Sequence, residues 1–218
     1  MLFNSYVYLF LFLPIFFVIF FFVEKKIINR FLILVANLVF YSWLNIKFLF
    51  IISLSVIINY FFSKYLIKKN KKLILFFAIT FNVGILIIFK YLDFLVLNLN
   101  YILGTSIDQF NLPFPLALSF FTLQQITFLV NCYDKQILKV KFLDYFNFVS
   151  FFPQLIAGPI ILFKDINYKL NVRKKEINYS NIYKGVFFII IGLFKKTILS
   201  DKLFNISNYG FTNVENIS

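Results

Sequence analysis

The sequence contains no histidine, one cysteine and only nine acidic residues among its 218 positions. Without histidine, the chain cannot itself form a Ser–His or Cys–His catalytic couple or a histidine metal site. The single cysteine, Cys132, excludes an intrachain disulfide and a multi-cysteine zinc site. We therefore expect no catalytic residue and no metal site in this chain.

Apolar residues, by contrast, are abundant. Hydrophobic residues make up 61% of the chain, charged residues make up 14%, and the mean hydropathy is +0.85. Soluble domains average about 45–50% apolar and about 25% charged residues, and a small soluble fold cannot bury so large an excess. The composition predicts an all-α, polytopic integral membrane protein with about six to seven transmembrane or re-entrant helices. We expect residues 1–218 to form a single membrane domain.

The basic residues lie in short clusters between the apolar segments. There are 22 Lys and Arg residues, and the formal net charge is +13. Such clusters are typical of cytoplasmic membrane loops, so the lipid bilayer is the expected partner and nucleic acid is not. Lys25, Lys26 and Arg30 follow the first apolar segment, which places the N-terminus outside.

The apolar segments predict the course of the chain. Residues 2–23 form a first helix in which Pro14 is expected to cause a kink. Residues 31–62 are expected to form a hairpin of two short spans that turns near Trp43 and Lys47. The remaining expectations are a span over residues 73–89, an interfacial helix over 94–103, a loop over 104–115 and a returning span over 114–132.

Residues 142–163 break the alternation of loops. Basic residues stand on both sides of this segment, with six in the loop that follows, so both flanks have the composition of cytoplasmic loops. Its interior holds residues that interrupt or weaken a helix, which favours a re-entrant pair of half-helices; a kinked span with one misplaced basic loop is the alternative. Since irregular backbone at membrane depth must be buried or line a wet cavity, residues 152–160 are the best candidate site.

Polar side chains inside apolar segments are costly, and each is therefore a functional hypothesis. The candidates for lining a tunnel or cavity are Ser119, Thr122, Gln124, Gln125, Gln154, Gly158 and Pro159. For the four residues of the 119–125 segment, packing between helices is the preferred interpretation and a cavity lining is the alternative. Hydrogen bonds between helices are the preferred interpretation for Asn37, Asn59 and Asn82, and a helix cap is preferred for Asp144.

Six segments of the chain occur in the order LFLFLPIF (9–16), VFYSWL (39–44), FKYLD (89–93), PFPLALSFFTLQQ (113–125), DYFNFVSFFPQLIAGPI (144–160) and GLFKK (192–196). The run SFFT at 119–122 and the run FFPQLIAGPI at 151–160 are the most specific parts. Together the six segments resemble the N-terminal half of the membrane-bound O-acyltransferases, in the bacterial branch typified by alginate O-acetyltransferase.

The resemblance implies a multi-helix enzyme of the bacterial inner membrane with a thinned centre penetrated by re-entrant segments. An acetyl group from a cytoplasmic co-substrate, acetyl-CoA or an acyl carrier, would reach hydroxyls of an envelope polysaccharide or peptidoglycan. The resemblance implies no bound cofactor, but it does imply an extracytoplasmic partner protein in acetyl transfer. In the family the catalytic histidine lies further downstream, so this chain is expected to be a fragment that is inactive alone. Gln154, Gly158 and Pro159 would then shape the tunnel.

A membrane channel or transporter subunit without enzymatic activity is the main alternative, because broken helices at membrane depth are common in transporters. A membrane scaffold that assembles with partners is a third possibility. Paired inverted repeats would favour transport, but the interruption near Pro153 has no counterpart in the first half of the sequence.

Overall fold

The computed structural model describes residues 1–43, 45–156, 158, 161–172 and 177–212, and every regular element among them is a helix. This confirms the all-α class. The chain divides into two compact units, each described here by itself. The larger comprises Met1 and Ile19–Arg173, and the smaller comprises Leu2–Val18 and Lys174–Ser218.

The two helices of the expected hairpin are present in the larger unit, and their crossing of a membrane stays a prediction. Helix α2 (Lys26–Ser42) is followed after a short turn by helix α3 (Ile46–Lys69). The Asn45 side chain begins α3, since its Oδ1 accepts a hydrogen bond from the backbone N–H of Lys47 at 2.9 Å. Asn70, in a left-handed conformation with φ of 45°, ends the helix.

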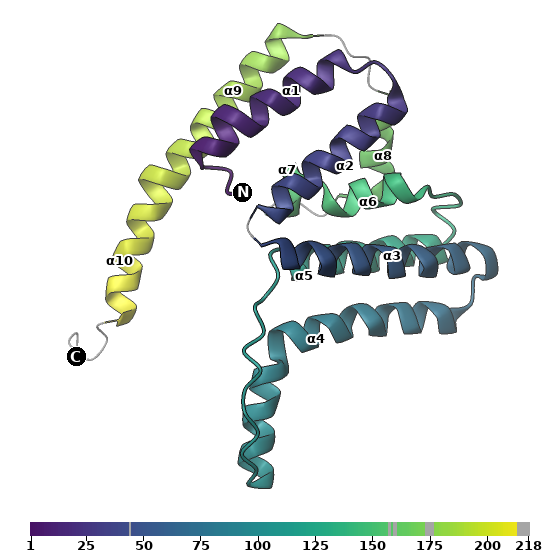
Figure 1. The fold of residues 1–218 in the computed structure, drawn as a ribbon, viewed down its shortest axis with the longest axis vertical. Coiled ribbons are helices and arrows are strands. Elements are labelled where there is room, and N and C mark those ends of the chain that lie inside the picture. Colours follow the sequence, from purple (N-terminus) through teal and green to yellow (C-terminus); the bar gives the residue numbers. More distant parts are fainter. Residues whose placement is uncertain (44, 157, 159–160, 173–176, 213–218) are drawn as a thin grey trace. The chain divides into compact units, whose positions relative to one another are not determined.

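Helix α4 (Lys72–Leu103) is continuous over 32 residues, so the prediction of a separate helix over 94–103 is wrong. No glycine or proline lies between Lys90 and Leu103 to stop the helix. Figure 1 shows that α4 instead changes direction along its length, and its C-terminal part forms an arm of the larger unit. The following loop returns along this arm, and its backbone N–H groups at Phe110 and Asn111 donate to the carboxylate of Asp93.

The core of the larger unit is built around an aromatic cluster. Helices α5 (Leu118–Tyr133), α6 (Phe142–Ser150), α7 (Phe152–Leu155) and α8 (Phe163–Val172) complete the unit. Helix α5 packs against α3, α4 and α6. The Phe128 and Tyr145 ring centroids are 4.4 Å apart, and Phe163 meets the Phe128 ring edge-on at 5.1 Å. These rings bring α5, α6 and α8 together.

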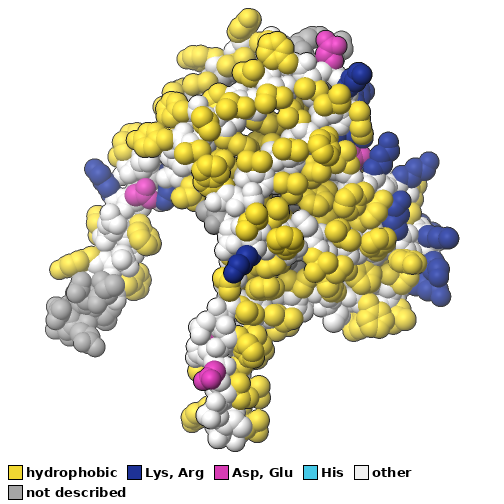
Figure 2. Space-filling view, in the orientation of Figure 1, with side chains coloured by type: hydrophobic (Ala, Val, Ile, Leu, Met, Phe, Trp, Pro, Cys, Tyr) yellow, Lys and Arg dark blue, Asp and Glu magenta, His cyan; other side chains and the backbone are white. Residues whose placement is uncertain are grey.

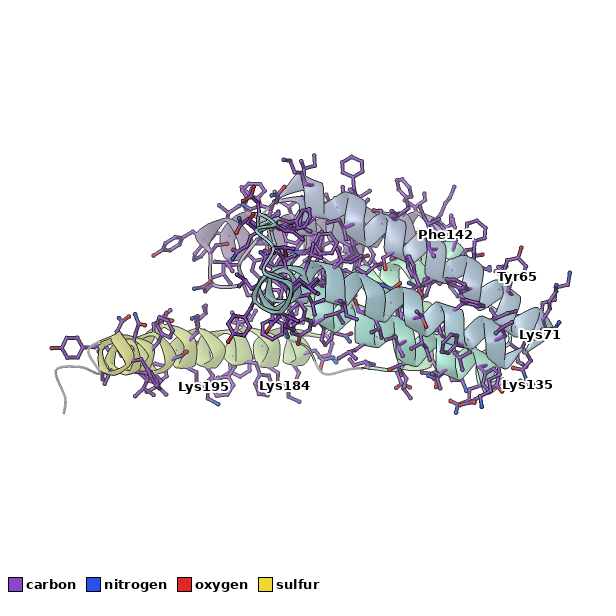
Figure 3. All side chains as sticks on the ribbon, turned by 90° about the horizontal axis from the view of Figure 1, so that it is seen from below. Tyr65, Lys71, Lys135, Phe142, Lys184 and Lys195 are labelled. Carbon is purple, nitrogen blue, oxygen red and sulfur yellow. The ribbon has the colours of Figure 1, made fainter. Side chains whose placement is uncertain are left out.

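Two helices of the described chain, α3 and α4, are long and apolar enough to cross a membrane, and most residues of their apolar windows are not fully buried within the unit. A total of six to seven membrane helices stays a prediction. Figure 3 places Lys71 and Lys135 at the same end of the larger unit, and Figure 2 shows basic side chains gathered along one edge. The two basic loops that were expected on the same side of the membrane therefore lie together.

In the described part of the smaller unit, every regular element is a helix. The unit contains the π-helix η1 (Val7–Phe12), the start of α1 (Leu13–Phe22), and the sequence α9 (Tyr179–Phe194), π-helix η2 (Lys195–Ser200) and α10 (Asp201–Thr212). Pro14 is the second residue of α1, and Phe10, four positions before it, lies in η1. Because proline lacks an N–H and its ring clashes with the carbonyl four residues earlier, a locally widened helix is the expected response.

Candidate functional site at a broken helix

The predicted interruption lies between α6 and α7. Helix α6 ends at Ser150, Phe151 has an extended ψ of 103°, and α7 starts at Phe152. Pro153 is the physical cause, because its ring would meet the carbonyl of Val149 in a continuous helix and it offers no N–H. The break is confirmed, and its re-entrant placement in a bilayer stays a prediction.

Two side chains form hydrogen bonds with the backbone groups that lose their helical partners at the break. In a continuous helix the N–H of Phe152 would donate to the carbonyl of Phe148. Here the Phe152 N–H donates to Oδ1 of Asn37 at 3.0 Å, and the Phe148 carbonyl accepts from Nε2 of Gln124 at 3.3 Å. Asn37 is on α2 and Gln124 is on α5, so two other helices supply the partners.

Helix α2 also contacts α6 through a polar cluster. The amide of Asn37 donates to Oδ1 of Asn147 at 3.3 Å, and Asn147 in turn donates to the carbonyl of Arg30 at 2.9 Å. The Arg30 guanidinium pairs with Asp144 at 3.2 Å. Asp144 lies in the first turn of α6 but makes no capping bond there, so the expected cap is wrong and an ion pair takes its place.

A second polar cluster joins α3, α5 and α6. Gln125 donates from Nε2 to the Ser55 hydroxyl at 3.0 Å, and the Tyr145 hydroxyl donates to its Oε1 at 3.1 Å. All three side chains are buried. Their hydrogen bonds satisfy polar groups that would be expensive to bury alone.

Asn59 and Asn82 pair as expected. Each amide donates to the other's Oδ1, at 3.1 and 2.6 Å, and each also donates to a backbone carbonyl one turn earlier in its own helix. Both side chains are fully buried between α3 and α4. Apart from a longer contact of 3.4 Å from Asn59 to the hydroxyl of Ser55, on its own helix, the bonds between helices stay within the pair, and they stabilise the contact between α3 and α4.

The candidate tunnel residues differ in their burial. Thr122, Gln124, Gln125 and Gln154 are buried, and Ser119 and Gly158 are half-buried. Pro159 lies outside the described residues. Gln124 and Gln125 take part in bonds between helices, which was the preferred interpretation for their segment. Whether any of these residues lines a tunnel stays a prediction.

Gly158 follows α7 closely. Its N–H donates to the carbonyl of Gln154 at 2.9 Å. A Cβ at this position would lie 2.4 Å from Cγ of Gln154 and 2.8 Å from its Cα and carbonyl oxygen. The chain can therefore approach the last turn of α7 only because residue 158 has no side chain.

Sequence reasoning missed Asn147, Arg30 and Tyr145 as members of the site. Asn147 carried a usable signal, since it is a lone amide in an otherwise apolar stretch of α6. Arg30 and Tyr145 carried none, because arginine beside a membrane and tyrosine in an aromatic run are both ordinary. Among the residues that the structure describes, no group of His, Cys, Asp and Glu side chains is placed to hold a metal.

The chain is homologous to bacterial membrane-bound O-acyltransferases, which confirms the resemblance. It is 33% identical to the peptidoglycan O-acetyltransferase of Helicobacter pylori, with 100% of this chain and 48% of that protein aligned. It is 28% identical to the probable alginate O-acetylase AlgI of Pseudomonas aeruginosa and 29% identical to that of Pseudomonas putida. Those alignments cover 97% of this chain and 42% and 45% of the two proteins.

The chain therefore spans about half the length of the curated relatives it matches. No protein-family model and no solved structure matches it.

Proposed function

We propose that this chain is part of a membrane-bound O-acetyltransferase that modifies hydroxyls of a cell-envelope sugar polymer. The observation that carries the proposal is the homology with O-acetyltransferases along the whole chain. Peptidoglycan is the preferred acceptor, because the peptidoglycan enzyme is 33% identical over all of the chain whereas the Pseudomonas aeruginosa alginate enzyme is 28% identical over 97%.

In this proposal the chain forms part of the route for the acetyl group and does not provide the general base. Activation of an acceptor hydroxyl needs a general base such as histidine, and these 218 residues contain none. The base would come from protein outside this sequence. The broken helix α6–α7, with Gln154 and Gly158 at its far side, would shape the route by which acetyl crosses the inner membrane.

The direction of acetyl transfer, from the cytoplasm outward, determines on which side the donor and the partner protein would lie. Acetyl-CoA or an acyl carrier would present the acetyl group at the cytoplasmic side, where we place the basic loops that contain Lys71 and Lys135. An extracytoplasmic protein would receive the group or pass it to the polymer. The N-terminus would lie outside.

Deletion of the gene in its own bacterium tests the acceptor. Peptidoglycan and secreted polysaccharide would be purified from deletion and complemented strains, and base-labile acetate would be measured in each. We expect acetate to fall in the peptidoglycan fraction and to return on complementation. A fall only in the polysaccharide fraction would favour an alginate-like acceptor, and unchanged acetate in both fractions would favour the transporter or scaffold alternative.

A second experiment tests whether the chain works as a fragment. The chain would be expressed in the deletion strain alone, and then together with the part of the Helicobacter pylori enzyme that it does not match. We expect peptidoglycan acetate only in the co-expressing strain. Acetate restored by the 218 residues in a strain that lacks any other relative would contradict the proposal that the base lies elsewhere.

A further inference from the structure

At the α6–α7 break, two side chains replace the partners of one missing helical hydrogen bond. The Phe148 carbonyl and the Phe152 N–H are the two ends of a single helical hydrogen bond that does not form. Gln124 takes one end and Asn37 takes the other, at 3.3 and 3.0 Å. The break is therefore held by one amide side chain from α5 and one from α2.

Burial makes these two contacts matter. Asn37 is 0% exposed and Gln124 is 2% exposed, and Phe152 is itself buried beside Phe40, with ring centroids 5.5 Å apart. A backbone N–H or carbonyl that is buried without a partner is strongly destabilising. If either amide were lost, α6 and α7 would have to move, and realignment toward a straighter helix is opposed by Pro153.

We infer that Asn37 and Gln124 are positioning residues that fix the direction of α7 relative to α6. They thereby set the location of Gln154, which α7 carries, and of Gly158, whose N–H bonds to the carbonyl of Gln154. The consequence for acetyl transfer rests on the proposed function above. The placement of α7 does not, and it can be measured separately.

The Asn59–Asn82 pair provides a matched control. These asparagines are also 0% exposed and also bond between helices, but they bond to each other and to carbonyls of their own helices. Substitution there removes an equally buried amide without opening a backbone group at the break. An effect confined to Asn37 and Gln124 therefore separates positioning from a general loss of stability.

Hydrogen exchange measured by mass spectrometry on the purified chain in detergent tests the placement. In Asn37→Leu we expect the peptide that contains Phe152 to exchange about tenfold faster, because its N–H loses its acceptor. In Asn82→Leu the same peptide should exchange as in the wild type. Equal exchange in the wild type and Asn37→Leu, or equal acceleration in both variants, overturns the inference.

A conservative variant guards against misfolding of Asn37→Leu. A buried aspartic acid in this apolar setting is held neutral, so Asn37→Asp retains an acceptor for Phe152 and a donor for Asn147. We expect Asn37→Asp to restore slow exchange at Phe152. A variant that folds but still exchanges quickly would show that an acceptor at residue 37 does not protect the Phe152 N–H, and would overturn the inference.

Acetylation is the functional readout. In the complemented deletion strain, we expect Asn37→Leu and Gln124→Leu to lower peptidoglycan acetate at least fivefold at equal membrane level, and Asn82→Leu to lower it less than twofold. Acetate preserved in the first two variants despite faster exchange overturns the link between α7 and transfer. If wild-type complementation itself restores no acetate, the proposed function fails, while the exchange result still decides the placement of α7.

Discussion

Two asparagine pairs in the larger unit are both buried but differ in their hydrogen-bond partners. Asn59 and Asn82 bond reciprocally between α3 and α4, with every described bond leading to the partner, to its own helix or to Ser55. Asn37 and Asn147 bond only once to each other between α2 and α6, and each also serves a backbone group elsewhere. The first pair joins two intact helices, and the second supports a broken one.

The difference shows why equal burial does not imply equal role. A closed pair can be replaced as a unit, since removing both members leaves no buried group without a partner. An open pair cannot, because Asn37 also accepts from Phe152 and Asn147 also donates to the carbonyl of Arg30. Four predictions probe these two pairs and the helices that carry or adjoin them, from the largest expected effect to the smallest.

The largest effect is expected at the ion pair beside the open pair. Asp144 and Arg30 are 10% and 16% exposed, so Asp144→Asn leaves a largely buried guanidinium without its anion and should lower the free energy of unfolding by about 3 kcal/mol. Unfolding by SDS titration in mixed micelles would measure it. The control is Asp201→Asn, which removes the exposed pair with Lys196 and should change stability by under about 0.5 kcal/mol. Equal losses would show that burial of the pair is unimportant.

The next effect is steric and lies at the far side of the break. Gly158→Ala puts a methyl group against Gln154, including its backbone, and should destabilise the protein by about 2 kcal/mol. Gly84, inside α4, has nothing within 4 Å of an added Cβ, so Gly84→Ala should stabilise by about 1 kcal/mol. Thermal unfolding in detergent would compare the two. A stabilising Gly158→Ala would mean that the approach of residue 158 to α7 is not close.

Double-mutant cycles test the contrast directly. Single Leu substitutions at Asn59 or Asn82 should each cost about 1 kcal/mol, and the double substitution should cost little more than either alone. For Asn37 and Asn147 the costs should add nearly in full, because each has a separate backbone partner. The same SDS titration gives both cycles. Equal coupling energies in the two cycles would abolish the distinction between closed and open pairs.

Much of this architecture could be predicted from the sequence. Apolar length and lysine clusters predicted the α2–α3 hairpin, and Pro153 predicted the break after α6. The continuity of α4 could not be predicted, since Lys90 and Asp93 resemble the end of a span; the structure instead uses Asp93 to hold the returning loop.

The hydrogen-bond partners of the buried amides could not be predicted from the sequence either. Sequence patterns show that Asn37 is a costly polar residue, but its bonds to Asn147 and Phe152 join positions 110 and 115 residues apart. Such pairings depend on how helices pack in three dimensions. The roles of Gln124 and Gln125 diverge for the same reason, because neighbours on one helix face different partners.

The smallest effect is expected where α5 begins, since this helix supplies Gln124 to the break and Gln125 to the cluster around Ser55. Ala117, the residue before α5, has a φ of 59°, a left-handed conformation that disfavours any residue with a Cβ. Ala117→Gly should relieve this strain, but glycine also gains freedom in the unfolded chain, so the net stabilisation should be under about 1 kcal/mol. In Ala78→Gly, inside α4, the same change should destabilise by about 1 kcal/mol or more, because there the backbone is already helical and the methyl group is buried. Thermal unfolding would compare the two variants. If both lose stability equally, the start of α5 is unstrained, and the hydrogen bond from the Tyr41 hydroxyl to the Leu116 carbonyl, at 2.8 Å, remains as the contact that fixes how α5 enters the core.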